Sequence, residues 1–145
     1  MPKIIGTVYK DNNEYGDFEW MIRQTKYNDA LFLFNDNMEH HMDSNEGAGN
    51  ACIRKYNRFS SFHKYPRSAG IITGSLRNGG FAELDKSTKN LIDINFEEIK
   101  YLIKKFGYKR IFYSRDKKSK KLGTCIFDVD DDVLKYITKK IYRSE

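Results

Sequence analysis

Residues 30–34 place the strongest constraint on how this chain can fold. They read Ala-Leu-Phe-Leu-Phe, a continuous apolar run that stops abruptly at the polar triplet Asn35-Asp36-Asn37. A strand with one face in water alternates apolar and polar side chains, whereas a strand covered on both faces is apolar throughout. The run therefore predicts a central strand that lies between two layers of other elements.

Strand and helix signals alternate along the rest of the chain. Strands are expected at 4–9, 69–73, 110–114 and 122–129, and helices near 18–28, from 50 towards 57, after Asp85, over 96–106 and from 130–132 onward. Asn95 is the expected N-cap of the 96–106 helix, with Glu98 as its capping-box partner and Gly107 as its left-handed stop. The alternation predicts an α/β three-layer sandwich with a mixed, mostly parallel central sheet. It also allows a C-terminal hairpin, formed by the last two strands, before the final helix.

The composition favours one soluble domain and excludes several classes of protein. Aromatic residues make up 14% of the 145 residues, too large a share for a disordered chain, and no linker or repeat interrupts the span 1–145. No apolar run approaches the roughly 20 residues of a membrane-spanning helix, and no signal-peptide block is present, so no membrane is expected. Two cysteines cannot form a disulfide scaffold, which favours a reducing compartment such as the cytoplasm.

The charge of the chain is unevenly distributed. Residues 1–50 carry four basic and nine acidic groups, a net charge of −5, whereas residues 51–145 carry 22 basic and 11 acidic groups, a net charge of +11. Together these give the overall charge of +6. Such asymmetry can mark a surface for nucleic acid or for the phosphates of a nucleotide, and an ordinary solvated surface is the other interpretation.

Small polar residues follow the expected strands at the end where ligands bind in open α/β sheets. The candidate ligand-binding residues are Asn35, Asp36, Asn37, Gly47, Gly49, Asn50, Ala51, Arg54, Thr73, Gly74 and Ser75. The segment 47–50, Gly-Ala-Gly-Asn, leads into an expected helix, where unpaired N–H groups and the helix dipole favour a phosphate. It matches neither the P-loop pattern nor a full dinucleotide fingerprint.

Each of these residues has an expected role toward a nucleotide-type ligand. Asn35 and Asn37 would hydrogen-bond ribose hydroxyls. The backbone amides of Gly47, Gly49 and Asn50 would hold phosphate. Thr73 and Ser75 would line the opposite wall, and Arg54 would add charge at the ligand's edge.

The order of these motifs resembles the macro-domain family. A strand, Asp29–Phe34, ends in Asn35-Asp36-Asn37, and Gly47-Ala48-Gly49-Asn50-Ala51 follows; Gly123-Thr124-Cys125-Ile126-Phe127 is similar to the family's second phosphate loop. The resemblance implies a mixed-sheet sandwich that binds ADP-ribose or a related nucleotide. It places Asn37 near the distal ribose and residues 47–51 at the diphosphate. Hydrolysis of a ribosyl link by an oriented water is the reaction implied for a catalytic member, and the sequence leaves open whether this chain is an enzyme.

The histidines and cysteines carry weaker signals. His40, His41 and His63 match no familiar zinc spacing, and adjacent histidines project in different directions, so no metal site and no cofactor are expected. His41 as a general base near a ribose is a second interpretation. Cys52 and Cys125 are isolated and are expected to be small buried residues.

A binding module without catalysis is the alternative function. Its candidate surface interleaves basic and aromatic side chains, as single-stranded nucleic acid requires: Arg54, Lys55, Tyr56, Arg58, Phe59, Phe62, Lys64, Tyr65 and Arg67. Lys117, Lys118, Lys120 and Lys121 form a second basic cluster. A composition rich in Lys, Asn, Ile and Tyr is typical of AT-rich genomes, including those of large viruses and phages. The alternative is therefore a viral or phage accessory protein, in the host cytoplasm, that binds nucleic acid or a host protein through its basic surface.

Overall fold

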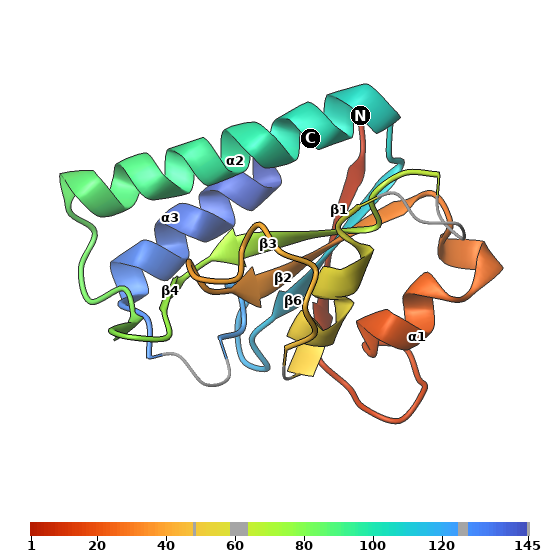
Figure 1. Cartoon of the computed structure of the whole chain (residues 1–145), viewed down its shortest axis with the longest axis horizontal. Coiled ribbons are helices and arrows are strands. Elements are labelled where there is room, and N and C mark those ends of the chain that lie inside the picture. The colour runs from red at the N-terminus through yellow and green to blue at the C-terminus, as the bar shows by residue number, and fades with distance from the viewer. Residues whose placement is uncertain (48, 59–63, 125–127, 145) are drawn as a thin grey trace.

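A central parallel sheet and the helices on its two faces make up the molecule. The computed structural model describes residues 1–47, 49–58, 64–124 and 128–144. Figure 1 shows α2 (Lys86–Phe106) and α3 (Asp131–Tyr142) on one side of the sheet and α1 (Phe18–Ile22) on the other. Among the described residues, no helix combines the length and the apolar character that a bilayer crossing requires.

The four strands of the sheet lie in the order β1 (Lys3–Val8), β6 (Arg110–Arg115), β2 (Ala30–Asp36) and β3 (Ser68–Ile72). Each neighbouring pair is parallel: β6 pairs with β1 on one side and with β2 on the other, and β3 pairs with β2. The predicted α/β sandwich with a mostly parallel central sheet is confirmed. A separate antiparallel pair, β4 (Gly74–Ser75) with β5 (Gly79–Gly80), follows β3 directly.

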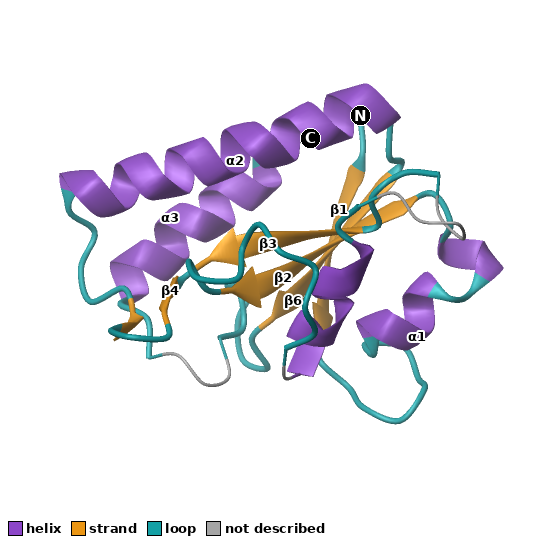
Figure 2. Cartoon of the chain, viewed as in Figure 1, coloured by secondary structure: helices purple, strands orange, loops and turns teal. Residues whose placement is uncertain are grey.

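Side-chain caps fix where the helices begin. Asp17, Asp85 and Asp130 precede α1, α2 and α3, and each accepts a hydrogen bond from a backbone N–H of the first turn. Gly107 ends α2 with φ at +64°, the left-handed stop expected from the sequence. Two 3₁₀ helices, η1 (Thr25–Tyr27) and η2 (Gly49–Tyr56), complete the described helical elements (Figure 2).

The apolar run of β2 supplies both faces of the core. Leu31 and Leu33 pack with α2 and α3. Ala30, Phe32 and Phe34 pack with α1, η1 and η2. All five side chains are fully buried. The inference drawn from this run, a strand covered on both faces, is therefore correct.

Two predicted boundaries were wrong. Asn95 is not an N-cap, because α2 begins nine residues earlier at Lys86 and runs through it. Asn95 is instead buried against the outer edge of β3: its Oδ1 accepts from the N–H of Ile72 at 2.8 Å, and its Nδ2 donates to the carbonyl of Gly70 at 3.0 Å. Of the strand expected at 122–129, the structure has one antiparallel bridge, between Arg115 and Leu122, and residues 125–127 lie outside the described part.

Candidate functional site at the carboxyl ends of β2 and β3

The polar residues that follow β2 and β3 lie against one another. Because the two strands are parallel neighbours, their carboxyl ends share one edge of the sheet. The N–H of Thr73 donates to the carbonyl of Asp36 at 3.1 Å, and the Thr73 hydroxyl donates to the Asn35 side chain. Farther along, the N–H of Met38 donates to the carbonyl of Gly74 at 3.0 Å. The predicted segments 35–37 and 73–75 are thus joined.

Arg54, which follows the third predicted segment, residues 47–51, is tied to β2 by a buried ion pair. Arg54 in η2 donates to Asp36 Oδ1 through Nε at 3.1 Å and through Nη2 at 2.5 Å. The side chains of Arg54 and Asp36 are 3% and 0% exposed. Arg54 Nη1 also donates to the carbonyl of Asn45 at 2.9 Å, which anchors the loop that leads into η2. The structure gives Arg54 a different task from the predicted one: it holds the loop in place and does not lie at a ligand's edge.

Asp36 is ionised in this setting. Burial raises the pKa of its carboxyl, but the approach of His41, the Arg54 guanidinium and the N–H of Asn37 together outweigh that effect and leave the pKa below its ordinary value. The Asn37 N–H donates at 2.8 Å. Buried pairs of this kind are tolerated only where hydrogen bonds satisfy the carboxylate and the cation together, as they do for Asp36 Oδ1.

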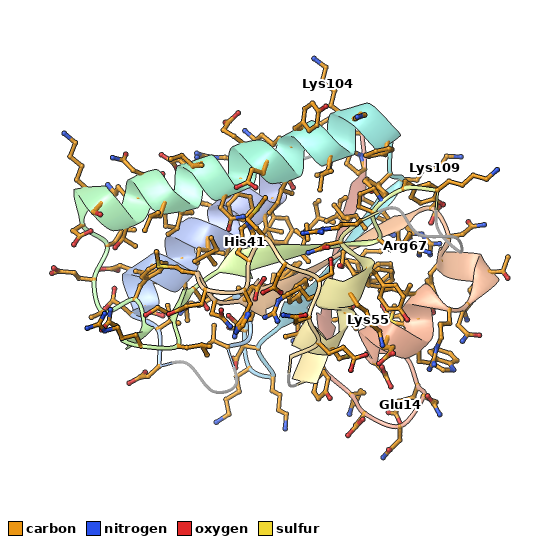
Figure 3. All side chains as sticks on the ribbon, viewed as in Figure 1. Glu14, His41, Lys55, Arg67, Lys104 and Lys109 are labelled. Atoms are coloured by element: carbon orange, nitrogen blue, oxygen red, sulfur yellow. The ribbon has the colours of Figure 1, made fainter. Side chains whose placement is uncertain are left out.

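His41 faces the second oxygen of the same carboxylate. Its Nδ1 lies 3.7 Å from Asp36 Oδ2, and neither atom has a hydrogen-bond partner among the described residues. Its Nε2 lies 3.7 Å from Oε2 of Glu98 on α2, and the imidazole is 12% exposed. Figure 3 shows His41 in front of the sheet, between η2 and α2. Gly70 makes this arrangement possible, since a Cβ at that position would collide with Asp36 Oδ2.

A cavity of about 580 Å³ lies beside His41, between the outer edge of β3 and α2. Its lining is partly apolar, with Ala69, Ile99 and Leu102, and partly polar, with His41, Asn95 and Glu98. This combination is typical of a small-molecule site, in which apolar area supplies affinity and a few polar groups fix orientation. Sequence reasoning did not identify the cavity, because α2 and β3 are brought together only by the tertiary fold.

The glycine loop is shaped by close packing and by a left-handed backbone. A Cβ on Gly47 would come within 2.8 Å of the Ala51 Cβ, and Gly49 has φ at +58°. The N–H of Gly47 donates to the carbonyl of Ala51 at 3.1 Å, which closes the loop onto the first turn of η2. Ala48 lies outside the described residues. The loop leads into a helical element as predicted, but the Gly47 N–H already has an acceptor within the loop, so it is not the phosphate donor that the sequence predicted.

Two cations of the basic and aromatic segment 54–67, Lys55 and Arg67, are held by partners within the fold. Arg67 is buried and donates to the carbonyls of Ala30 and Tyr27, and Lys55 pairs with Glu19 at 2.6 Å and with Glu46 at 2.5 Å. Figure 3 shows Arg67 and Lys55 among the elements that pack against the sheet. Phe59, Phe62 and His63 lie outside the described residues, as do Cys125, Ile126 and Phe127 of the second loop motif.

The other predicted candidates have local partners. His40 Nδ1 lies 2.8 Å from Asp43 Oδ2 within one exposed turn, and the Asn37 side chain accepts the N–H of His40 at 2.9 Å. Glu39 accepts the N–H of Leu76 at 2.9 Å, which ties this turn to the β4–β5 hairpin. In the described part of the chain, His, Cys, Asp and Glu side chains form no group of three or more that could hold a metal ion.

Comparison of the chain with protein-family models, with curated proteins and with solved structures found no match.

Proposed function

We propose that this chain binds a nucleotide-type ligand, similar to ADP-ribose, at the carboxyl ends of β2 and β3. One observation carries the proposal. Segments 35–37 and 73–75 are hydrogen-bonded to each other at one edge of the sheet, and Arg54, three residues after segment 47–51, pairs with Asp36 at the same edge. The parallel pairing of β2 and β3 brings the first and last of these segments to the edge of the sheet at which ligands bind in open α/β folds.

The topology supports this location. After β2 the chain turns to η2 on one face of the sheet, and after β3 it continues to α2 on the other face. Where neighbouring strands lead to opposite faces, their connections separate and leave a crevice outside the carboxyl ends, which is the usual ligand site of such folds.

The chemistry of the loops supports a phosphate and a sugar. The first N–H groups of η2 have no intrahelical acceptor, so they can donate to phosphate oxygens next to the positive end of the helix dipole. Asn37 would bind a ribose hydroxyl. In this proposal Asp36 and Arg54 position the loops and do not contact the ligand, because both are buried.

Calorimetric titration with ADP-ribose tests the proposal. We expect binding, and we expect Asn37→Ala to weaken it about tenfold, which corresponds to the loss of one hydrogen bond of about 1.4 kcal/mol. Asn90→Ala is the matched control, because Asn90 is an exposed asparagine on α2 that belongs to none of the three candidate segments. Absence of heat up to about 1 mM ADP-ribose, a Kd equivalent to about −4 kcal/mol, would contradict the proposal.

Hydrolysis of a ribosyl link is tested in the same samples. In this proposal His41 transfers the proton, because its Nδ1 lies 3.7 Å from Oδ2 of Asp36, a carboxylate that could orient the imidazole. Release of free ADP-ribose from an ADP-ribosylated peptide would extend the proposal from binding to catalysis. We expect His41→Gln to abolish that release while ADP-ribose binding changes less than about threefold, a difference below 1 kcal/mol.

A further inference from the structure

A chain of three hollows runs along α3, on the face of the sheet opposite α1. The first has a volume of about 430 Å³ and lies at Gly6, Tyr113 and Arg115. The second, about 830 Å³, lies beside α3 itself. The third, about 800 Å³, lies where α3 ends near the end of α2. The first and second share Ser119, Lys120 and Tyr142, and the second and third share Arg143, so the three hollows follow one another along α3 and are together called the α3 groove below.

The lining of the α3 groove is strongly cationic. The three hollows contain four, five and four Lys or Arg side chains, with Lys120 and Arg143 each counted twice, and Asp132 is the one carboxylate among the described lining residues. Asp131, just outside the lining, pairs with Lys121 and Lys135. The remaining cations of the groove have no carboxylate partner in the described part of the chain: Lys100, Lys104, Lys109, Arg115, Lys117, Lys118, Lys120, Lys139 and Arg143.

Aromatic rings lie among these cations. Tyr142 is 36% exposed and lies in the wall shared by the first two hollows. Its ring meets the Tyr113 ring edge-on at 5.8 Å, and the two hydroxyls are 2.9 Å apart, which fixes its orientation. Tyr136 lines the second hollow, and its hydroxyl is held by Asp93 at 2.5 Å. A groove with positive charge along its length and fixed rings in its wall is the arrangement that single-stranded nucleic acid requires.

We propose that the α3 groove binds single-stranded nucleic acid. Phosphates would lie on the lysines of the 117–121 turn and of α3, and a base would stack on Tyr142. The acidic first third of the chain contributes only its terminal residues, Met1 and Pro2, together with Gly6 to the groove lining, so it would not repel the strand. This site is separate from the edge of β2 and β3, and the proposal does not depend on the function proposed there.

Fluorescence anisotropy with a labelled oligonucleotide of about 20 thymidines, at about 50 and 200 mM salt, tests this inference. We expect binding at low salt that weakens steeply at high salt. The variant with Lys117→Gln, Lys118→Gln and Lys120→Gln should lose at least about tenfold in affinity, and its salt slope should fall by about 2, since three phosphate contacts at about 0.7 each are removed. Tyr142→Leu should lose at least about fivefold, the lower end expected for one stacked base.

A matched triple variant separates a site from a general charge effect. Lys10→Gln, Lys26→Gln and Lys86→Gln remove the same charge from exposed lysines outside the groove lining. This variant should bind the oligonucleotide within about twofold of the parent chain, well under 1 kcal/mol. Equal losses in both triple variants would overturn the proposal. So would equal affinity for a duplex of the same length, or binding to anionic vesicles with no binding to the oligonucleotide. The Asn37→Ala variant should still bind the oligonucleotide. A failure of the ADP-ribose proposal and a failure of the nucleic-acid proposal can therefore be told apart.

Discussion

At the scale of single residues, Asp36 organises the carboxyl end of β2. One of its oxygens accepts from Arg54 and from the Asn37 N–H, and the other faces His41 and Gly70. A buried carboxylate that loses its cation remains as an uncompensated charge, which costs more than the pair itself contributes. Stability at this position therefore depends on keeping the two partners together.

Arg54→Met is expected to lower the free energy of unfolding by about 3–5 kcal/mol, because it leaves Asp36 charged and buried without its cation. Urea denaturation measures this change. Lys140→Met is the control, since Lys140 pairs with Asp93 at 2.9 Å at a partly exposed site, where a pair is worth about 1 kcal/mol or less. Similar losses of unfolding free energy in the two variants would show that the buried Asp36–Arg54 pair contributes no more to stability than a partly exposed pair.

The same carboxylate should make the fold sensitive to acid. The pKa of Asp36 in the folded chain lies below its ordinary value of 3.8. Ionised Asp36 therefore stabilises the fold at pH values above 3.8, and this contribution is lost as pH falls through the lower folded pKa. Asp36→Asn should be less stable than the parent chain near neutral pH, and the difference should shrink as the pH falls below 3.8. A stability difference between the two chains that stays constant as the pH falls would contradict a lowered pKa for Asp36.

Cys52 is expected to react slowly with alkylating agents. Burial, followed by the hydrogen bond and negative charge of Glu19, raises the pKa of its thiol to about 12, so very little thiolate exists near pH 8. Peptide-resolved mass spectrometry after iodoacetamide treatment measures the modified fraction. Glu19→Gln should increase the rate, and the urea-unfolded chain should react fully. Rapid modification of Cys52 in the folded chain would refute the prediction.

At the scale of elements, α2 and β3 illustrate what the sequence could and could not predict. The apolar stripe of Phe96, Ile99 and Ile103 and the stop at Gly107 identified the second half of α2 correctly. The sequence predicts a cap at Asn95, because an Asn directly before an apolar stripe is typical of an N-cap. Its actual role, closing the hydrogen bonds of the β3 edge, depends on a tertiary contact that no local pattern encodes.

The candidate site, too, could be predicted from the sequence only in part. The segments after β2 and β3 could be predicted, because parallel strands bring their carboxyl ends to one edge. The inward position of Arg54 and the approach of His41 to Asp36 could not, because both depend on how residues 38–47 pack back on the sheet.

Asn95→Ala should destabilise the chain by about 1–3 kcal/mol, because it leaves the N–H of Ile72 and the carbonyl of Gly70 without a partner at a largely buried edge. Thermal or urea unfolding checks the value. Asn90→Ala, one and a half turns earlier on an exposed face of the same helix, should change stability by less than about 0.5 kcal/mol. A loss no larger than that of Asn90→Ala would mean that the edge bonds contribute nothing.

At the scale of the whole molecule, the sheet order joins the two ends of the chain. β6 lies between β1 and β2, so β1 has no other strand neighbour in the described sheet. Part of the excess positive charge of residues 51–145 is gathered at one place, since nine cations without a carboxylate partner in the described part of the chain line the α3 groove.

A chain that ends at Gly107 should not fold cooperatively, although it keeps three of the four strands of the sheet. Without β6, β1 loses its strand partner, and β2 loses the neighbour on one side. Circular dichroism during urea titration should give a shallow, gradual change in place of a sigmoidal transition. A sharp transition with a native-like m-value would contradict this expectation.

The position of β6 late in the sequence also delays the pairing of β1 during synthesis. About a hundred residues separate Val8 from Arg110, and a ribosome adds roughly 5–20 residues per second. The first strand is therefore made some 5–20 seconds before the strand that pairs with it. Throughout that interval β1 is an unpaired strand with β-branched and apolar side chains, open to other partners. The nascent chain is thus most exposed to mispairing at its beginning, and only synthesis of its last third removes that exposure.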